Sequence, residues 1–472
     1  MDIVELKVND SSTTKPYFFG YIPVTMRTLL IICLICFPWT AEAATWKVGL
    51  GKVDITPQDP IRQGGYAARN KPSEGIRTPL WVKALMVTDA KGKKAVLVTA
   101  DIIRYPRFIS DSIRNELLRR YKLEKSQIIL NGSHTHSGPE INVHNLQYMA
   151  TAEELKKVAE FSGILYKATL QAVDAAMKNP FEAKIWSGSG IARFAVNRRN
   201  NKESEILNLA ELKGPFDHSV PVLKIVDQSN SVRAFVFGYA CHPTVLSDYL
   251  ISGDYPAYAQ MSLEKKFPGA QAMFFIGAAG DQNPLPRRSV PLAIKYGEEL
   301  ALAVEAACNS PMTELEPTLN YSYREIDLPY EKAPPSRAEL EKVASDTLTH
   351  PNWIVNQARV LLDRLGRGEK LPGSYPYPVQ IWQMGKQVIV TLGGEIVVEY
   401  ALAVKKRLGP QTIVMGYSND LMAYIPSLKV LQEGGYEGSR SPLFTTPWHQ
   451  AIESNIIEEV VRQARSLGIS AL

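Results

Sequence analysis

The sequence predicts an α/β fold, a layered single domain in which mixed β-sheets are flanked by helices. Two observations support this prediction. Short runs of apolar and β-branched residues alternate along the chain with longer runs at helical spacing, as expected for strands and helices that pack in layers. The sequence has no internal repeat and no stretch rich in Pro, Gly or Ser that would separate domains. We therefore expect residues 44–472 of this 472-residue chain to form one domain.

The expected elements follow from hydrophobic spacing. A hairpin of two strands, 83–87 and 95–99, is joined by the turn sequence DAKG. In helix 107–122 apolar residues recur three and four positions apart, and a buried strand, 127–130, and a long helix, 152–178, come next. Further strands are expected at 183–187, 221–226, 233–239, 272–276, 387–392 and 413–415. Further helices are expected at 290–308, 336–346, 353–366, 396–408 and 448–466.

Composition and charge exclude several classes of protein. Hydrophobic residues make up 45% of the chain and charged residues 21%, which are globular values and argue against long disorder. The formal net charge of +5 is small for this length and lies in no long basic run. A nucleic-acid partner is therefore not expected.

The first 43 residues carry the marks of a secretory leader rather than of the fold. Met26 and an arginine precede the apolar run LLIICLICF, which is too short to span a bilayer, and an A-E-A site ends at Ala43. We expect the true start at Met26, cleavage near Ala43 and export to the periplasm or the medium. An uncleaved anchor or a buried helix is the alternative. The cysteines that remain, Cys241 and Cys308, are expected to be packed thiols and not a disulfide scaffold.

The clearest chemical motif is SHTHSGP, directly after the buried strand 127–130. It places His134 and His136 two positions apart, and such residues on an extended segment point to the same side. Neutral imidazole is the commonest metal ligand, and loops at strand ends often carry binding groups. A pair of hydrogen-bonded structural histidines is the alternative interpretation.

Three further polar residues follow predicted strands. His242 ends an apolar strand, Asp281 lies in a glycine-rich turn, and Glu395 follows the sequence LGG. Each has an ordinary structural explanation: a hydrogen-bonded core histidine, a turn aspartate and a carboxylate at a helix start. Together the four strand ends suggest one metal-bearing cleft at one edge of a sheet. Zinc hydrolases use a few N and O ligands and leave one position open for water.

Longer stretches resemble successive motifs of the neutral/alkaline non-lysosomal ceramidase family. In the family's order they are GLGKVDITP, GGYAAR, NGSHTHSGP, VNRR, GYACHPTVLSDYLISGDYPAYAQ, GAAGDQNP, GGEIVVEYALAVKKRLG and GYSNDLMAYIPSLKVLQEGGYEGS. They cover about residues 48–440, nearly the whole mature chain. The resemblance implies a fold like the ceramidase catalytic domain and a secreted or membrane-surface zinc amidase that cleaves the N-acyl bond of ceramide.

The resemblance also implies site residues. The family's ligands for one zinc ion per chain correspond to His134, His242, Glu395 and Tyr424. His136 corresponds to the general base, which takes a proton from the metal-bound water and then protonates the leaving amine. Arg198 and Tyr436 match residues expected to contact the polar head of the substrate or the oxyanion.

The sequence departs from the family pattern in two places. The family motif G-D-x-S-P-N carries a serine regarded as catalytic, whereas this chain reads GDQNP, with Gln282 or Asn283 at that position. Neither side chain can be the nucleophile, so we expect metal-activated water to attack directly, with the amide of Gln282 helping to bind the oxyanion. The chain also ends soon after the GYEGS motif, so the immunoglobulin-like C-terminal domain of the longer ceramidases is not expected.

The sequence thus predicts an exported zinc-dependent amidohydrolase of lipid metabolism that acts on the linear amide bond of a ceramide-like lipid. One alternative is a zinc hydrolase with a different N-acyl, ester or lactone substrate. Another is a metal-stabilised binding protein without activity. The expected partner is a small amphipathic N-acyl lipid or another N-acyl small molecule, with peripheral contact with a membrane surface and no nucleic acid.

Overall fold

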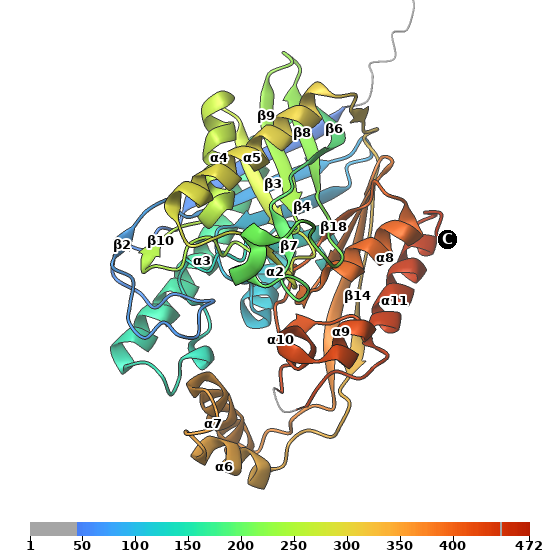
Figure 1. Ribbon diagram of the computed structural model, residues 1–472. Coiled ribbons are helices and arrows are strands. Elements are labelled where there is room, and N and C mark those ends of the chain that lie inside the picture. The colour runs from blue at the N-terminus through green and yellow to red at the C-terminus, as the bar shows by residue number, and fades with distance from the viewer. Residues whose placement is uncertain (1–44, 444–445) are drawn as a thin grey trace, which may run out of the picture. The chain divides into compact units, whose positions relative to one another are not determined.

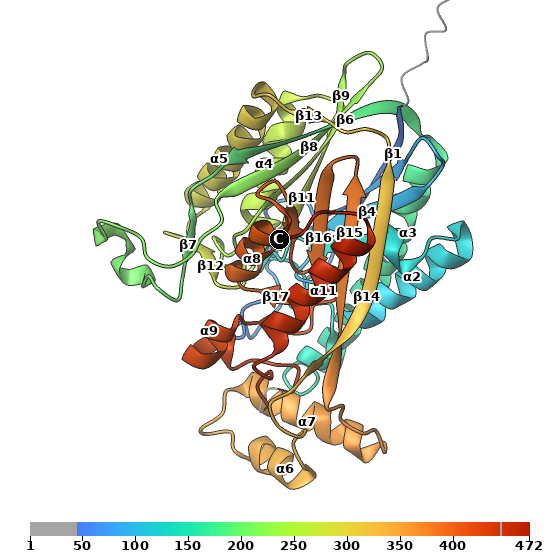
Figure 2. The ribbon, with the colours of Figure 1, turned by 90° about the vertical axis from the view of Figure 1, so that its right-hand side faces the viewer.

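Two β-sheets lie face to face in the part of the chain that the computed structural model describes, residues 45–443 and 446–472 (Figures 1 and 2). The larger sheet has nine strands in the order β11 (Gln271–Ile276), β9 (Val232–Tyr239), β8 (Ser219–Asp227), β6 (Phe181–Ile191), β1 (Trp46–Asp54), β3 (Trp81–Thr88), β4 (Lys94–Ala100) and β5 (Ile128–Gly132), with β13 (Thr313–Glu314) beside β6. The smaller sheet has the order β14 (Leu319–Pro329), β15 (Ser374–Met384), β16 (Gln387–Leu392) and β18 (Ile413–Met415). Buried apolar side chains from both sheets, such as Phe275 and Trp382, fill the space between them.

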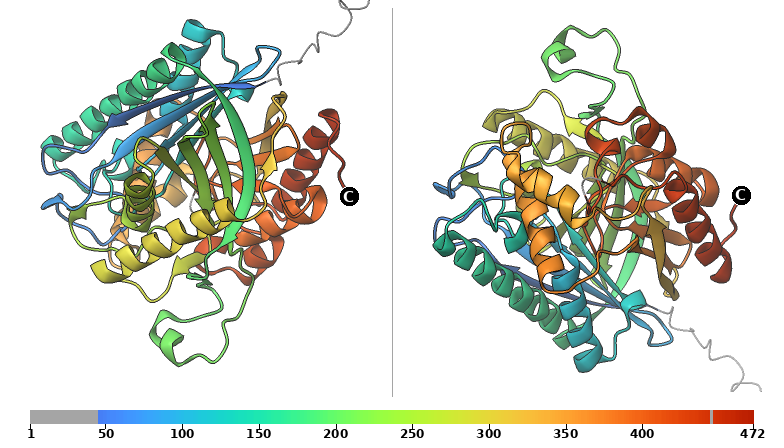
Figure 3. Two further views of the ribbon diagram at one scale, coloured as in Figure 1. Left: turned by 90° about the horizontal axis from the view of Figure 1, so that it is seen from above. Right: turned by 90° about the horizontal axis from the view of Figure 1, so that it is seen from below.

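Helices cover the outer face of each sheet, which gives four layers (Figure 3). On the larger sheet, α2 (Arg107–Tyr121) and α3 (Ala152–Lys178) pack over one half, and α4 (Asp254–Lys266) and α5 (Val290–Asn309) over the other. On the smaller sheet lie α8 (Val398–Leu408) and α11 (Ile452–Ser466). Both sheets contain parallel and antiparallel pairs. The predicted α/β class with mixed sheets and flanking helices is confirmed.

Local sequence signals explain several of these elements. The predicted hairpin is β3 and β4, and in its turn Asp89 Oδ1 accepts hydrogen bonds from the backbone N–H groups of Lys91 and Lys93. Helix α3 begins with a capping box in which the side chains of Thr151 and Glu154 each accept from the other's backbone N–H. The sequence did not predict β1, α4, β14 or β15, and the closing helix begins at Ile452 and not at 448.

The carboxyl ends of five strands meet at one edge of the two sheets. These strands are β5, β9 and β11 of the larger sheet and β16 and β18 of the smaller one. The buried side chain of Asn131 in β5 connects three of them. Its Oδ1 accepts from the backbone N–H of Ile276 at 3.1 Å, and its amide donates to the Gly416 carbonyl at 2.8 Å and to Ser418 Oγ at 3.0 Å. One side chain thus fixes the starting points of loops from both sheets.

The segment between β14 and β15 forms an arm of two helices, α6 (Arg337–Ser345) and α7 (Asn352–Gly366), which extends beyond the sheets at the lower end of Figure 1. Two short helices, α9 (Leu428–Glu433) and α10 (Gly435–Gly438), come before α11. Short strand pairs connect the loops: β2 (Gly75–Ile76) with β10 (Leu250–Ile251), β7 (Ala195–Asn197) with β12 (Gln282–Pro284), and β17 (Glu395–Ile396) with β19 (Tyr424–Ile425).

The expected leader, with its start at Met26 and cleavage near Ala43, lies outside the described residues. Ala44–Leu472 groups as one compact unit by itself. Within the described ranges, no helix is both long and apolar enough to cross a membrane. Cys241 is buried, Cys308 is half-buried, and both are free thiols.

Candidate metal centre and substrate cavity

His134 lies just beyond β5 in a conformation that its neighbours enforce. Its φ of 65° is in the left-handed region, which a residue other than glycine adopts only when the surroundings hold it there. The backbone N–H of His134 donates to the Ile102 carbonyl at 2.9 Å, and its ring Nδ1 lies 2.8 Å from the carbonyl oxygen of Ile103. The Nδ1 contact with a carbonyl requires a proton on Nδ1, so Nε2 is left as a free electron-pair donor.

His242 has the same arrangement at the end of β9. The side chain is fully buried, its backbone N–H donates to the Gln282 carbonyl at 3.0 Å, and Nδ1 lies 2.6 Å from the Ala279 carbonyl oxygen. Burial, and then the positive charge of Arg198, lowers the pKa of His242 to about 4. The ring is therefore neutral at physiological pH, with Nε2 free to bind a metal.

The carboxylate of Glu395, which begins β17 just after β16 of the smaller sheet, lies close to both of these nitrogens. Glu395 Oε2 is 3.4 Å from His134 Nε2 and 3.2 Å from His242 Nε2. Donors about 2.0–2.2 Å from a tetrahedral zinc ion are roughly 3.4 Å apart, so these separations match the edges of a zinc coordination tetrahedron. Two imidazoles and one carboxylate also form a donor set that zinc commonly takes. The residues therefore fit a zinc site.

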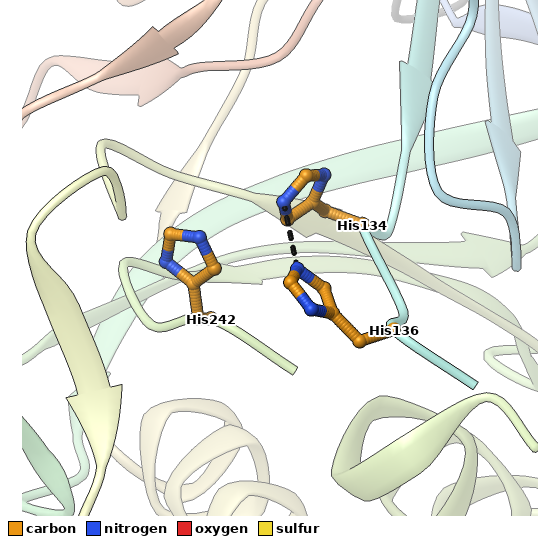
Figure 4. A group of neighbouring side chains, drawn as sticks. All are labelled: His134, His136 and His242. Carbon is orange, nitrogen blue, oxygen red and sulfur yellow. Dashed lines mark hydrogen bonds between the residues drawn. The ribbon is translucent and has the colours of Figure 1, made fainter. Parts of the chain in front are cut away.

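His136 is the third imidazole of the cluster, and its ring nitrogens have different surroundings. One ring nitrogen from each of His134, His136 and His242 lies within 4.8 Å of the others (Figure 4). His136 Nε2 is 3.2 Å from His134 Nε2, but His136 Nδ1 is buried and has no hydrogen-bond partner among the described residues. Burial, followed by His134 and His242, lowers the pKa of His136 well below its usual value. The ring is neutral, and no carbonyl fixes its tautomer.

The segment 64–69 holds His136 in place from the other side. Gly65 has a φ of +90°, and a Cβ atom at this position would lie 2.4 Å from His136 Cγ, so only glycine allows the approach. The Tyr66 ring meets the His136 ring edge-on at 4.8 Å, and the guanidinium of Arg69 donates to the His136 carbonyl. The position of His136 thus depends on the packing of its ring and on hydrogen bonds to its backbone.

Tyr424 is brought beside Glu395 by the short parallel pair of β17 and β19, in which the two residues are in register. Arg198 donates to the Tyr424 hydroxyl at 3.2 Å. Burial, and then the Glu395 carboxylate, raises the pKa of Tyr424 well above its usual value, while Arg198 opposes this shift. Tyr424 is therefore protonated at neutral pH unless a further positive charge, such as a metal ion, lies beside it.

The other predicted site residues lie around this group. Arg198 also donates to Glu437 Oε1 at 2.8 Å and to the Gly280 carbonyl at 2.8 Å. Tyr436 is 51% exposed, and its ring lies 5.3 Å from that of Tyr424. Gln282 is fully buried, and its amide nitrogen donates to the Ala240 carbonyl at 2.6 Å. Direct contact of Gln282 with an oxyanion stays a prediction, as do the roles of Arg198 and Tyr436.

A cavity of about 1130 Å³ opens onto this cluster. We call the part of its lining formed by His134, His136, Glu395 and Tyr424 the floor. We call the part formed by residues 353–367, in α7 and directly after it, and by residues 435–442 the outer wall. The outer wall mixes apolar side chains such as Ile354 and Leu361 with charged ones such as Arg440. The volume lies slightly above the usual range of small-molecule pockets, about 300–1,000 Å³.

Two residues close to the centre were not predicted from the sequence. The fully buried ring of Tyr417 lies 4.6 Å from that of His134, and its hydroxyl has no partner among the described residues. Asn131, described above, joins the strand ends. Both residues lie in or just after a predicted strand, as His134, His242 and Glu395 do. A search for polar residues at the ends of predicted strands could therefore have found them.

The sequence matches a family model and several known proteins. The family model for "Neutral/alkaline non-lysosomal ceramidase, N-terminal" matches residues 46–284. The neutral ceramidase of Drosophila melanogaster is 27% identical over 256 residues, which are 51% of this chain and 36% of that protein. The neutral ceramidase of Pseudomonas aeruginosa is 25% identical over 274 residues, 54% of this chain and 40% of that protein. The matches thus span about a third to two fifths of the length of these relatives.

Two solved ceramidase structures have a fold similar to that of most of this chain. The crystal structure of the Pseudomonas aeruginosa neutral ceramidase matches with a TM-score of 0.70 at 20% identity, over 90% of this chain and 75% of that one. A ceramidase "complexed with C2" matches with a TM-score of 0.70 at 17% identity, over 91% and 76% of the two chains. At these identities the likeness concerns the fold.

Proposed function

The chain belongs to the neutral/alkaline non-lysosomal ceramidase family, and from this premise we propose that it is a zinc-dependent amidohydrolase that cleaves an N-acyl bond of a ceramide-like amphiphile. One observation carries the proposal. His134 and His242 each use Nδ1 on a backbone carbonyl and direct Nε2 to the same oxygen of Glu395. Nothing in a purely structural pair of histidines requires two nitrogens and a carboxylate oxygen to converge in this way.

The same contacts divide the cluster into ligands and a base. His134, His242 and Glu395 would hold the zinc ion, with Tyr424 as the fourth ligand. A ligating histidine usually donates its second ring N–H to a fixed acceptor, which His134 and His242 do and His136 does not. His136 can therefore exchange protons at its ring nitrogens, which suits a general base better than a ligand. Zinc bound at this site would polarise the scissile carbonyl and lower the pKa of a water molecule.

Side chains of this protein would transfer the protons and stabilise the negative charge that develops in the reaction. His136 would accept the proton of the attacking water and return it to the leaving amine. Arg198, within hydrogen-bond distance of the Tyr424 hydroxyl, would stabilise negative charge at the tyrosine or on the oxyanion, and Tyr436 and Gln282 would assist there. No serine is required at position 282, because water and not a side chain forms the new bond to carbon.

We also propose that the protein is exported, because residues 26–43 have the composition of a signal peptide. N-terminal sequencing of the exported protein should begin at Ala44. Retention of residues 1–43 on the exported protein would contradict this proposal.

Hydrolysis of N-octanoylsphingosine by the purified protein tests the function. We expect fatty acid and free amine to be released by the zinc-loaded protein, activity to disappear after dialysis against dipicolinic acid, and zinc to restore it. The same assay on Gln282→Ser tests whether activity needs the serine that the family motif has and this chain lacks. If the wild type hydrolyses no N-acyl compound or ester while Gln282→Ser does, the natural protein is a binding protein and direct attack by water is wrong.

A further inference from the structure

Arg440 forms part of the outer wall between two aromatic rings. Its guanidinium carbon lies 3.8 Å from the ring centre of Tyr436 and 4.2 Å from that of Trp353 on α7. Both distances are within the range of cation–π attraction, which favours a planar guanidinium over an ammonium group. The two rings hold the position of the side chain and leave the edge of the guanidinium, which carries its five N–H donors, for other contacts.

The described residues offer this edge no acceptor. Arg440 makes no ion pair and donates no hydrogen bond to any side chain or carbonyl within residues 45–443 and 446–472. The nearby carboxylates are already used: Glu437 pairs with Arg198 at 2.8 Å, and Glu433 pairs with Arg199 at 3.0 Å. Arg440 therefore presents a half-buried positive charge to the cavity, and no described carboxylate neutralises it.

A second arginine that lines the cavity also has unused donors. Arg104 follows Ile103, the residue whose carbonyl contacts His134 Nδ1. Its Nε is buried without a partner in the described part of the chain, and its nearest carboxylate, on Glu140, lies 3.6 Å away, beyond hydrogen-bond distance. By contrast, Arg107 is paired with Asp420 at 2.8 Å. Arg440 and Arg104 thus each keep N–H donors without an acceptor among the described residues, whereas Asp363, which also lines the cavity, already accepts hydrogen bonds from Gln147 and Tyr148.

From these observations we infer that the substrate is an N-acyl compound with an anionic group, such as an N-acyl amino acid, and that Arg440 binds its carboxylate. This inference rests on the proposed amidohydrolase function: it keeps the N-acyl bond and the acyl chain and changes the preferred head group to an anionic one, so that neutral N-octanoylsphingosine would be a poorer substrate. Arginine suits the task because its fork of N–H donors matches the two oxygens of a carboxylate. A neutral ceramide-like lipid would leave these donors unpaired.

The test compares two ligands of equal chain length, N-octanoylglycine and the neutral N-octanoylethanolamine. Their hydrolysis is measured with wild type, Arg440→Met and Arg440→Lys, and their dissociation constants are measured by calorimetry on the same proteins carrying His136→Ala. Methionine keeps apolar contact with both rings and removes the charge. Arg337→Met is the matched control, since Arg337 lies on α6 of the same arm, is 53% exposed at its side chain and does not line the cavity.

We expect the wild type to prefer N-octanoylglycine in kcat/KM and in binding, and Arg440→Met to reduce this preference about 10- to 100-fold, as the loss of a charge-assisted hydrogen bond predicts. Arg440→Lys should restore part of the preference, and Arg337→Met should not alter it. An equal loss on both ligands would mean that Arg440 only holds the outer wall together, and would overturn the inference. So would equal binding of the two ligands by the wild type. If neither these compounds nor N-octanoylsphingosine is hydrolysed although the anionic ligand binds through Arg440, the proposed function fails and the anion site stands.

Discussion

The floor and the outer wall of the cavity are held in place by different kinds of interaction. At the floor, backbone carbonyls beyond strand ends orient His134 and the fully buried His242 next to it. On the outer wall, side chains connect the elements, as in the stack of Arg440 between Trp353 and Tyr436. The floor belongs to two packed sheets, whereas α7 belongs to an arm that extends beyond them (Figure 2).

This difference suggests that the floor carries out the reaction and the outer wall selects the substrate. Groups that act on a metal ion and a proton must be placed to within a fraction of an ångström, and packed strand ends provide this precision. Groups that select a substrate tolerate adjustment, and side-chain contacts on a helical arm allow it. Substitutions on the floor should therefore affect metal binding and turnover, and substitutions on the outer wall should affect KM.

The largest effect is expected from His242→Ala. The change removes one nitrogen ligand and leaves Glu395 Oε2 with a single histidine neighbour, so zinc should be lost and turnover should fall to background. Zinc content by mass spectrometry and hydrolysis of the preferred substrate measure both effects. His350→Ala on the α6–α7 loop is the control. Full zinc occupancy in His242→Ala would refute the ligand assignment.

His136→Ala should reduce turnover by about 10²–10⁴-fold, the range for loss of a general acid–base group, while zinc stays bound. The distinction from His242 follows from the free Nδ1 of His136. Steady-state kinetics on protein of known zinc content provides the measurement. Zinc loss equal to that of His242→Ala would place His136 among the ligands.

Gly65→Ala tests the positioning of His136 without changing a polar group. The new Cβ would lie 2.4 Å from His136 Cγ and displace the ring, and a displacement of about 1 Å can cost about 10²-fold in turnover. Gly92→Ala is the matched control, because Gly92 has a similar φ of +82° but a Cβ there would meet no described atom within 4 Å. Both variants carry the same backbone strain, so an equal loss of activity in the two would contradict the packing argument.

On the outer wall, Asn356→Ala should raise KM about 10-fold, in line with the loss of two hydrogen bonds made by a buried side chain, and leave zinc content unchanged. The Asn356 amide donates to the His144 carbonyl at 2.9 Å, and its Oδ1 accepts from the Tyr148 N–H at 2.8 Å, so it fixes α7 to the loop after β5. Asn352→Ala, at the exposed start of α7, is the control. A fall in kcat with unchanged KM would show that the arm acts on the floor.

The smallest effect concerns stability. Burial, and then the nearby Asp281, raises the pKa of Glu399 from 4.5 to about 7. The folded protein therefore binds this proton more tightly than the unfolded chain, and the free energy of unfolding decreases as pH rises from about 4.5 to 7. Glu399→Gln should be more stable than wild type by about 1–2 kcal/mol at pH 8 and nearly equal at pH 4, allowing for partial exposure. Urea unfolding at the two pH values measures this, and a difference independent of pH would contradict it.

Much of the fold could be read from hydrophobic spacing, and the elements that were missed have physical reasons. In β15 the residues Pro376 and Pro378 argue against a strand, yet both lie in the half that pairs only with β14, where a lost donor is tolerated. The partner strand β14 is mostly exposed or half-buried and so lacks apolar alternation. The packing of the two sheets against each other depends on contacts between residues far apart in the chain, which spacing does not reveal.

Sequence spacing also fails to reveal which residues come together in the candidate site. His134, His242 and Glu395 could be nominated because each follows an apolar strand, but their convergence requires both sheets to meet at one edge. Tyr424 came only from the resemblance to a family, since a tyrosine after a loop has no distinctive spacing. The stack around Arg440 joins α7 to residues after α10, and no local pattern indicates it.

The central claim is that His136 is a base beside the metal and not one of its ligands. A crystal structure of the zinc-loaded protein, with the ion located by anomalous scattering, tests it most directly. We expect zinc about 2.0–2.2 Å from the Nε2 atoms of His134 and His242 and from an oxygen of Glu395, with His136 Nε2 outside this distance. Zinc at ligand distance from His136 Nε2, or bound away from this cluster, would mean that His136 is not the base proposed here.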